Sequence, residues 1–341
     1  MAVYTKINAD QIQGFLTELG QGRLLSWSGV ADGLENTTYF LTCDSLAPNS
    51  APGGGPRQWV LSILESADSQ QIEFSVALMR RLHGAELPVP ELWLHPGNGR
   101  VVHELAGKPA LLSARIEGRH PGGFVADGQR RASPGQCRAV GDFLGRMHTL
   151  GGPALPNFPN SHGLAWLRST LVTVGAELTE AERVLVDGLV ARQADLRRRD
   201  PGLPVGAIHA DLFRDNTLFT DNRLNAVIDF YSACTDWLLL DAAIVVNDWA
   251  RNSDGGLNEA LCGHFLEAYS RHRRFVASER RHWQDMLGFA ALRFWLSRLL
   301  GRVQGRAPDI APELSGRAEK DPEEFARIVK TDGTGVLPLP L

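Results

Sequence analysis

The sequence has few cysteines and lacks any long apolar run. The four cysteines are scattered along 341 residues, at Cys43, Cys137, Cys234 and Cys262. Because there is no CxxC pair and no Cys/His cluster, neither a disulfide framework nor a structural zinc site is expected. The longest apolar stretch, Leu238–Val246, is interrupted by Asp241 and is too short to span a bilayer. The N-terminus also lacks the apolar core of a signal peptide. These absences predict a cytoplasmic protein with no membrane association.

An excess of positive charge is missing as well. The formal net charge is -4, so a broad electrostatic footprint for nucleic acid is not expected. The chain is 43% hydrophobic, which is enough for a large buried core, and its length favours two domains or lobes. The composition therefore indicates a globular protein and disfavours a role in binding nucleic acid.

The first part of the chain has the periodicity of a small sheet with two helices. Apolar spacing predicts a helix at 9–19, and a second helix runs from Asp68 or Ser69 to about His83. Alternating or β-rich runs predict strands at 24–27, 38–43, 58–64, 100–105 and 109–116. The Ser-, Pro- and Gly-rich segment 44–57 is predicted to be a hairpin loop without a function of its own.

After Gly118 the balance shifts to helix. Ser133-Pro134 is a typical helix start, and Thr179 with Glu182 forms a capping-box pattern. Further helices are predicted near 257–272, 279–300 and 322–330. The predicted organisation is thus an α+β protein with a small antiparallel-sheet lobe at 1–112, a connector at 113–118 and a larger helical lobe at 119–341.

One short β-like segment interrupts the helical part and carries the chemistry. Two strand-like runs, 216–220 and 223–228, are joined by Asp221-Asn222, a pair suited to a tight turn. A regular hairpin about this turn places Thr217 opposite Ala226 and Asn216 opposite Val227. Asp211, Asn216 and Asp229 then gather at one end of the hairpin.

These three side chains suit phosphoryl transfer. Magnesium prefers oxygen ligands and completes its shell with phosphate oxygens. Kinases combine such a site with a base in a His-x-Asp sequence, an Asn five residues after the Asp, and a further Asp on the next strand. We expect Asp211 to orient and accept the proton of a substrate hydroxyl. Asn216 and Asp229 are expected to hold the metal, and His209 to brace the loop.

The motifs HADLFRDN, VIDF and DWLLLDAA resemble the aminoglycoside phosphotransferase/choline kinase superfamily, whose members have a protein-kinase-like fold. Within it, GLENTTYFL at 33–41, LPVPEL at 87–92, GKPALL at 107–112 and the stretch 228–249 are most similar to the bacterial type II homoserine kinases. The resemblance covers almost the whole chain and implies ATP and Mg²⁺ as cofactors.

The resemblance also implies a nucleotide site. The loop covering the nucleotide would contain Gly33, Glu35, Asn36 and Thr37. The connector would meet the adenine through Ser113, Arg115 and Ile116. Asp241 resembles the buried Asp that braces the catalytic loop in the superfamily, although an ordinary helix-capping Asp is the alternative.

One feature departs from the kinase pattern. Ser62 occupies the position of the strand lysine that pairs with nucleotide phosphates, and no lysine occurs between Lys6 and Lys108. The replacement cation is left open among Arg57, Arg80, Arg81 and Arg115. Glu73 is either the acidic partner on the first-lobe helix or a simple surface residue.

The resemblance implies homoserine as substrate, with an ammonium, a carboxylate and a hydroxyl to be recognised. Asp248 is a candidate for the ammonium, and Asn247 and Trp249 for the pocket wall. Arg214 is a candidate for the carboxylate or a phosphate. Arg293 and Arg298 are further candidates, and a surface ion pair is the alternative for each of the three arginines. Kinases of other alcohols (aminoglycoside, choline or sugar) and a nucleotide-binding pseudokinase are the competing functions, and the oligomeric state stays open.

Overall fold

The computed structural model describes residues 4–30, 36–44, 56–65, 68–121, 132–150, 155–252, 256–305, 321–331 and 337–340. The chain divides into two compact units. The first comprises the described residues of Met1–Ile72 and Pro90–Ile116, and the second comprises those of Glu73–Val89, Glu117–Pro308 and Glu319–Leu341. The lobe boundaries expected from the sequence, including the connector at 113–118, stay a prediction.

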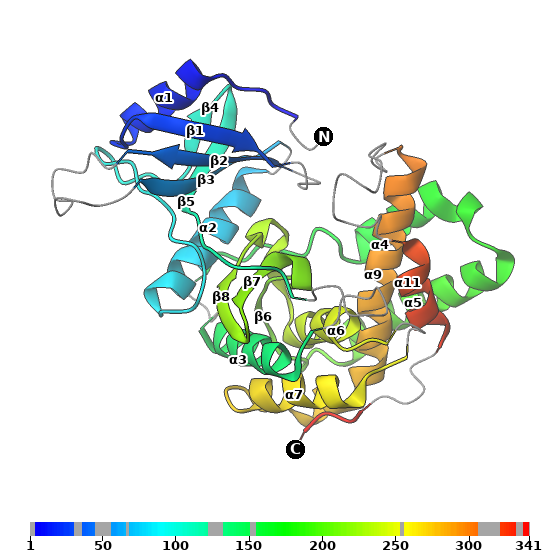
Figure 1. Ribbon diagram of the computed structural model, residues 1–341. Helices are drawn as coiled ribbons and strands as arrows, with labels where there is room; N and C mark the ends of the chain where they lie inside the picture. Colours follow the sequence, from blue (N-terminus) through cyan, green and yellow to red (C-terminus); the bar gives the residue numbers. More distant parts are fainter. Residues whose placement is uncertain are drawn as a thin grey trace. The chain divides into compact units, whose positions relative to one another are not determined.

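A five-stranded antiparallel sheet forms the first unit (Figure 1). In sheet order its strands are β1 (Leu24–Gly29), β2 (Thr37–Cys43), β3 (Arg57–Ile63), β5 (Lys108–Ala114) and β4 (His103–Leu105). Each strand lies within two or three residues of its predicted position. The segment between β2 and β3, apart from its ends, falls outside the described residues.

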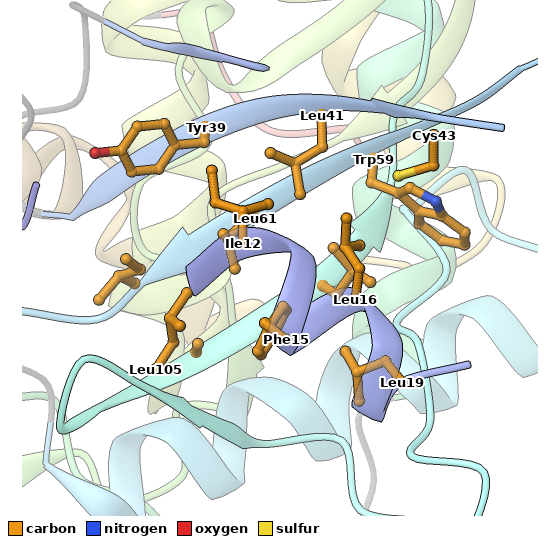
Figure 2. Packing of buried hydrophobic residues seen from close by; sticks show 13 residues of the cluster. Ile12, Phe15, Leu16, Leu19, Tyr39, Leu41, Cys43, Trp59, Leu61 and Leu105 are labelled. Atoms are coloured by element: carbon orange, nitrogen blue, oxygen red, sulfur yellow. The ribbon is translucent and has the colours of Figure 1, made fainter. Parts of the chain in front are cut away.

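Helix α1 (Ala9–Glu18) packs its apolar side chains on one face of this sheet (Figure 2). Asn8 and Gln11 form a capping box that fixes its first turn. Ile12, Phe15 and Leu16 are buried against alternate residues of the strands, because strand side chains point to opposite faces in turn. The face toward α1 is therefore apolar, and the residues between these positions lie on the other face.

The second unit is mostly helical. Its helices are α2 (Ser69–Gly84, from Glu73 onward), α3 (Pro134–Leu150), α4 (Leu164–Val174), α5 (Glu180–Arg199), α6 (Leu238–Trp249), α7 (Glu259–Ser270), α8 (Ala277–Arg281), α9 (Trp283–Val303) and α11 (Pro322–Lys330). Its strands are β6 (Val205–Ile208), β7 (Thr217–Thr220), β8 (Arg223–Val227) and β9 (Cys234–Trp237). Among the described helices, none is long and apolar enough to cross a membrane.

The long helix α9 is central to the second unit and contacts α4, α5, α6 and α11. The predicted Thr179–Glu182 capping box is present at the start of α5, and α11 has its predicted bounds. The single helix predicted at 279–300 is wrong: α8 and α9 are separate helices, with a break at His282.

The catalytic segment forms the predicted hairpin of β7 and β8, but its predicted register is wrong. The structure pairs Thr217 with Val227 and Leu218 with Ala226. Asn225 is an extra residue in β8, and the register shifts between Leu218 and Phe219. Its side-chain amide donates to the Glu117 carbonyl (2.7 Å) and to Thr220 Oγ1 (2.8 Å), contacts that stabilise this β-bulge.

Helices α3 and α7 approach closely through glycines. A Cβ atom added at Gly141 would lie 2.4 Å from the Phe265 carbonyl oxygen, and one at Gly145 would lie 2.7 Å from that of Tyr269. These contacts involve backbone, which cannot move aside as a flexible side chain can. The sequence at these positions is therefore fixed by helix packing.

We expect Gly141→Ala to lower the free energy of unfolding by about 1–3 kcal/mol, because α3 and α7 must separate. Gly188→Ala is the matched control: it lies in α5, where an added Cβ meets nothing within 4 Å. That change should raise stability by up to about 1 kcal/mol through helix propensity. Urea denaturation of both variants measures the difference. Equal stability of Gly141→Ala and wild type would contradict the close packing.

Candidate active site

Asp211 and Asn216 lie in direct contact at the entrance to β7. Asn216 Nδ2 donates to the Asp211 carbonyl (2.8 Å) and to Asp211 Oδ2 (2.9 Å). This pair of bonds fixes the orientation of the Asp211 carboxylate. No hydrogen bond between described residues uses Asn216 Oδ1, so that oxygen can serve as a metal ligand.

His209 ties this loop to the strand that carries Asp229. Its Nε2 lies 3.1 Å from the Ile228 carbonyl, and its Nδ1 lies 3.3 Å from the Asp211 N–H. A neutral ring protonated at Nε2 satisfies both contacts, and complete burial lowers the pKa of His209, favouring this form. The Ile228 N–H also donates to the Asn216 carbonyl (2.9 Å). The structure thus brings Asp211, Asn216 and Asp229 together, with His209 as the predicted brace.

Two residues of this site have left-handed backbone. Asp229 has φ 65° and ψ 61°, and Ala210 has φ 64°. Such conformations cost energy in residues with a Cβ, and they cluster where the surroundings impose a particular side-chain direction. The side chain of Asp229 is exposed, as a ligand to a bound metal must be before binding.

Asp241 of α6 anchors the catalytic loop through its buried carboxylate. Its carboxylate accepts the backbone N–H of His209 (2.7 Å) and of Ala210 (2.9 Å), and it is completely buried. Burial alone would raise the pKa of Asp241, but the hydrogen bonds from the His148 ring and from the His209 backbone N–H lower it below its ordinary value. The ionised carboxylate stabilises the loop, which is the bracing role predicted for it and not a simple helix cap.

A buried chain of polar side chains continues outward from Asp241. His148 Nε2 lies 3.2 Å from Asp241 Oδ2, and His148 Nδ1 lies 2.8 Å from the Tyr269 hydroxyl. Arg273 donates to that hydroxyl (3.0 Å) and pairs with Glu279 (2.8 Å). Burial lowers the pKa of His148 despite the neighbouring carboxylate, so the ring is neutral and every donor faces an acceptor.

Hydrogen bonds within the protein occupy three of the predicted substrate residues, Arg214, Asn247 and Asp248. Arg214 binds Asp248 through its backbone N–H (2.7 Å), Nε (3.1 Å) and Nη2 (3.1 Å). Asn247 is buried and donates to the Leu287 carbonyl (2.8 Å), and it accepts from Arg251 (2.7 Å). The contacts between Arg214 and Asp248 link the loop after Asp211 to α6.

Trp249 is also buried, and its Nε1 donates to the Leu212 carbonyl (3.1 Å). Its indole therefore supports the residue that follows Asp211. The role of Asn247, Asp248 and Trp249 in substrate recognition stays a prediction. The contacts that the structure shows for Asp248 and Trp249 position the catalytic loop, whereas Asn247 joins α6 to Leu287 of α9.

The two arginines of α9 differ in their surroundings. Arg298 binds the Asp321 carbonyl (2.7 Å) and Glu324 (2.8 Å) and lies over the Phe325 ring. Arg293 is buried, with 6% of its surface exposed, and Nη1 donates to the Ala210 carbonyl next to Asp211. Arg298 is thus occupied by α11, whereas Arg293 reaches the catalytic loop.

The predicted nucleotide residues lie in the first unit. Gly33 and Glu35 fall outside the described residues. Asn36 accepts the Glu65 N–H (3.2 Å). Thr37 is fully buried and its hydroxyl donates to Glu65 (2.6 Å). The Thr37 side chain therefore stabilises the sheet.

On β5 and beyond it, Ser113 pairs with Val60. The Arg115 N–H donates to the Gln58 carbonyl (3.1 Å). Ile116 follows as the last residue grouped with the first unit. The assignment of all these residues to a nucleotide site stays a prediction.

A cation that replaces the missing strand lysine must lie on the sheet face that carries Ser62. Lys108 forms an ion pair with Glu65 beside Thr37, and Thr37 has the same alternation as the residues that face α1. Arg57 shares the alternation of Trp59, which also faces α1. Arg115 instead lies over the ring of Phe40, 4.1 Å from its centroid, on the face that carries Ser62. Of the candidates in this unit, Arg115 is the one on the face of Ser62. Arg80, Arg81 and Glu73 belong to the second unit.

Within the described residues, no three His, Cys, Asp or Glu side chains gather to hold a metal by themselves. Asn216 Oδ1 and Asp229 offer two oxygen ligands at one end of the hairpin. That donor set fits Mg²⁺, which is usually held by one or two protein oxygens with phosphate and water completing the octahedron. The residues present are therefore compatible with the predicted cation when a nucleotide triphosphate is bound.

The sequence reasoning missed the network beyond Asp241. His148 was not among the candidate residues, yet it joins Asp241 to Tyr269. The sequence signal available was a histidine on the buried face of α3, next to Met147. A buried histidine needs partners for both ring nitrogens.

Comparison with known proteins places this geometry in context. The model of the phosphotransferase enzyme family matches residues 26–275. A homoserine kinase of Pseudomonas aeruginosa is 35% identical over 325 residues, which cover 95% of this chain and 94% of that protein. A homoserine kinase of Methylobacillus flagellatus is 36% identical over 335 residues, covering 97% and 95%.

Solved structures show the same fold at low sequence identity. Amicoumacin kinase hAmiN, solved with AMP-PNP, Ca²⁺ and Ami, has a TM-score of 0.63 at 16% identity and covers 98% of this chain and 96% of its own. A microcompartment-associated aminopropanol kinase has a TM-score of 0.63 at 17% identity, covering 96% and 99%. These likenesses confirm the predicted α+β kinase-like fold.

Proposed function

Since the chain belongs to the phosphotransferase enzyme family, we propose that it is a homoserine kinase that transfers the γ-phosphoryl group of ATP to the homoserine hydroxyl. The observation that carries this proposal is the 35% identity to a homoserine kinase over nearly the full length of both chains. Residues 209–229 support it, because they gather a base and two oxygen ligands. The product, O-phosphohomoserine, would feed threonine synthesis in the cytoplasm.

In the proposed reaction Asp211 orients the homoserine hydroxyl and accepts its proton as the oxygen attacks the γ-phosphorus, with ADP as the leaving group. Asn216 fixes the Asp211 carboxylate for this step. His209 and Asp241 hold the loop in place, since phosphoryl transfer depends mainly on positioning and charge stabilisation. Asp229 and Asn216 would hold Mg²⁺, which neutralises phosphate charge when bound. Arg115 is our candidate for the cation beside the nucleotide.

Aminoglycoside, choline and sugar kinases remain the alternatives to test. Unpaired arginines in the helical part of the chain would favour a substrate with a carboxylate over these alcohols. Of the candidate arginines, Arg214 and Arg298 are paired with Asp248 and Glu324. That argument now depends on Arg293 alone. A pseudokinase function is disfavoured because a binding protein has no need for a positioned base at Asp211.

A substrate panel tests the proposal directly. ADP release is measured with homoserine, choline, kanamycin and methylthioribose, each with Mg²⁺ and with excess chelator. We expect homoserine to be preferred by at least about 100-fold in kcat/KM, a ratio that a site built for charged groups readily reaches. Chelation should abolish turnover. Preference for any other alcohol would exclude the homoserine assignment, and turnover without a divalent cation would exclude the metal role of Asp229.

A further inference from the structure

Arg293 is a buried guanidinium beside the catalytic loop without a carboxylate partner. It is 6% exposed, and its one hydrogen bond to a described residue goes to the Ala210 carbonyl. Among the described residues, no Asp or Glu forms an ion pair with it. Buried charges in proteins are normally paired, so the site around Arg293 lacks one negative charge.

The other arginines that the sequence offered for the same purpose are occupied. Arg214 makes three hydrogen bonds to Asp248. Arg298 binds Glu324 and stacks on Phe325. Arg293 differs from both because its partner is a neutral carbonyl oxygen, which leaves most of its N–H groups for another acceptor.

Two further described groups lie near Arg293, and neither carries a negative charge. Burial and the positive charge of Arg293 lower the pKa of His162 to about 3. His162 precedes α4, which packs against α9, and it is neutral at physiological pH. It therefore supplies no negative charge, and the phenyl ring of Phe294, 4.5 Å from the guanidinium carbon, adds only a cation–π contact.

On these grounds, and resting on the proposed function, we propose that Arg293 binds the carboxylate of the amino-acid substrate and so selects homoserine over alcohols that lack a carboxylate. The short side chain of homoserine places its hydroxyl roughly 5 Å from its carboxylate. The Ala210 carbonyl that Arg293 contacts belongs to the peptide joining Ala210 to Asp211. A guanidinium held at this point reaches the carboxylate of a substrate whose hydroxyl meets Asp211, and its planar fork matches a carboxylate in bidentate fashion.

The test compares two substrates in wild type and in Arg293→Met. L-Homoserine carries the carboxylate, and 3-aminopropanol is the same molecule without it. In Arg293→Met we expect kcat/KM for homoserine to fall about 100-fold, mostly through KM, the range for a lost charged hydrogen-bonded pair. The kcat/KM for 3-aminopropanol should fall at least about 10-fold less than that for homoserine, because this substrate is affected only by the lost hydrogen bond to the Ala210 carbonyl. Arg298→Gln, on the same helix, should keep the wild-type ratio between the two substrates.

A binding measurement tests the assignment without turnover, and a second variant tests it if Arg293→Met does not fold. Calorimetric titration with L-2-aminobutyrate, which keeps the carboxylate but lacks the hydroxyl, should show binding to wild type and about 100-fold weaker binding to Arg293→Met. Arg293→Lys keeps the charge without the fork, so its homoserine KM should lie between the other two. If Arg293→Met loses its native circular dichroism, Arg293→Lys provides the comparison.

The possible results separate the inference from the proposed function. A wild-type enzyme without homoserine activity overturns the function, and with it the carboxylate assignment. An active wild type whose substrate ratio is unchanged in the Arg293 variants overturns the assignment alone. An equal loss on both substrates also overturns it, since Arg293 would then only position the loop through the Ala210 carbonyl.

Discussion

Asp211→Asn is expected to lower kcat by about 1,000-fold or more, because the change removes the general base from a carefully positioned site. The asparagine can still accept the Asn216 Nδ2 hydrogen bond through its amide oxygen, so the loop should keep its shape. The KM for ATP should stay within about 2-fold, since the loss concerns the reacting hydroxyl and not nucleotide binding. Steady-state kinetics with saturating Mg²⁺ measures both quantities.

Asp221→Asn is the matched control for this prediction. Asp221 lies at the turn of the same hairpin, is exposed and has φ 53°, a left-handed conformation that asparagine also tolerates. We expect near wild-type turnover. An Asp211→Asn enzyme that kept full activity would rule out the base, whatever the control showed.

The second large effect is expected for Asp241→Asn, in both stability and turnover. The ionised carboxylate accepts two loop N–H groups and His148. The asparagine amide has one oxygen and one NH₂ group. Its NH₂ group would therefore face one of the N–H donors that the buried carboxylate accepts. Breaking a buried charged network costs about 3–5 kcal/mol of unfolding free energy, and a displaced loop should lower kcat at least 100-fold.

The pH dependence of stability checks the electrostatic part of this prediction. The pKa of Asp241 is lowered in the folded protein, so its stabilisation is present above the unfolded pKa of about 4 and is lost as pH falls through the folded value. The stability difference between wild type and Asp241→Asn should therefore be largest near neutral pH and shrink in acid. Asp187→Asn, an exposed change in α5, should shift stability by less than about 0.5 kcal/mol at any pH. A difference that grows in acid would contradict an ionised Asp241.

Local features of the sequence predicted local features of the fold. The Thr179–Glu182 capping box and Pro322 at the start of α11 mark helix ends through contacts within one turn, and both are present. The catalytic hairpin was predicted for the same reason, because its turn and its β-rich runs lie next to each other in the chain.

Features that depend on distant partners were not predicted. The hairpin register was wrong because the bulge at Asn225 depends on a hydrogen bond to Glu117, far away in the sequence. The ion pairs of Arg214 and Arg298 were among the alternatives considered, but their partners Asp248 and Glu324 could not be chosen from spacing. His148 needed α6 and α7 to supply its two partners, and no local pattern indicates which helices will meet.

The bulge at Asn225 also bears on how this hairpin can vary between related sequences. The turn at Asp221-Asn222 lies at the end opposite Asp229, and Asn222 is fixed there by Ser133 (2.6 Å). Because Leu224 pairs with Phe219 and Ala226 with Leu218, deleting Asn225 would remove the bulge but keep both pairings and the position of Asp229. Deleting a paired residue of β8 would instead draw Asp229 along the strand by about 3.4 Å and reverse which face its neighbours occupy. Active relatives should therefore tolerate loss of the bulge residue, whereas deletion of any paired residue between the turn and Asp229 should be rare.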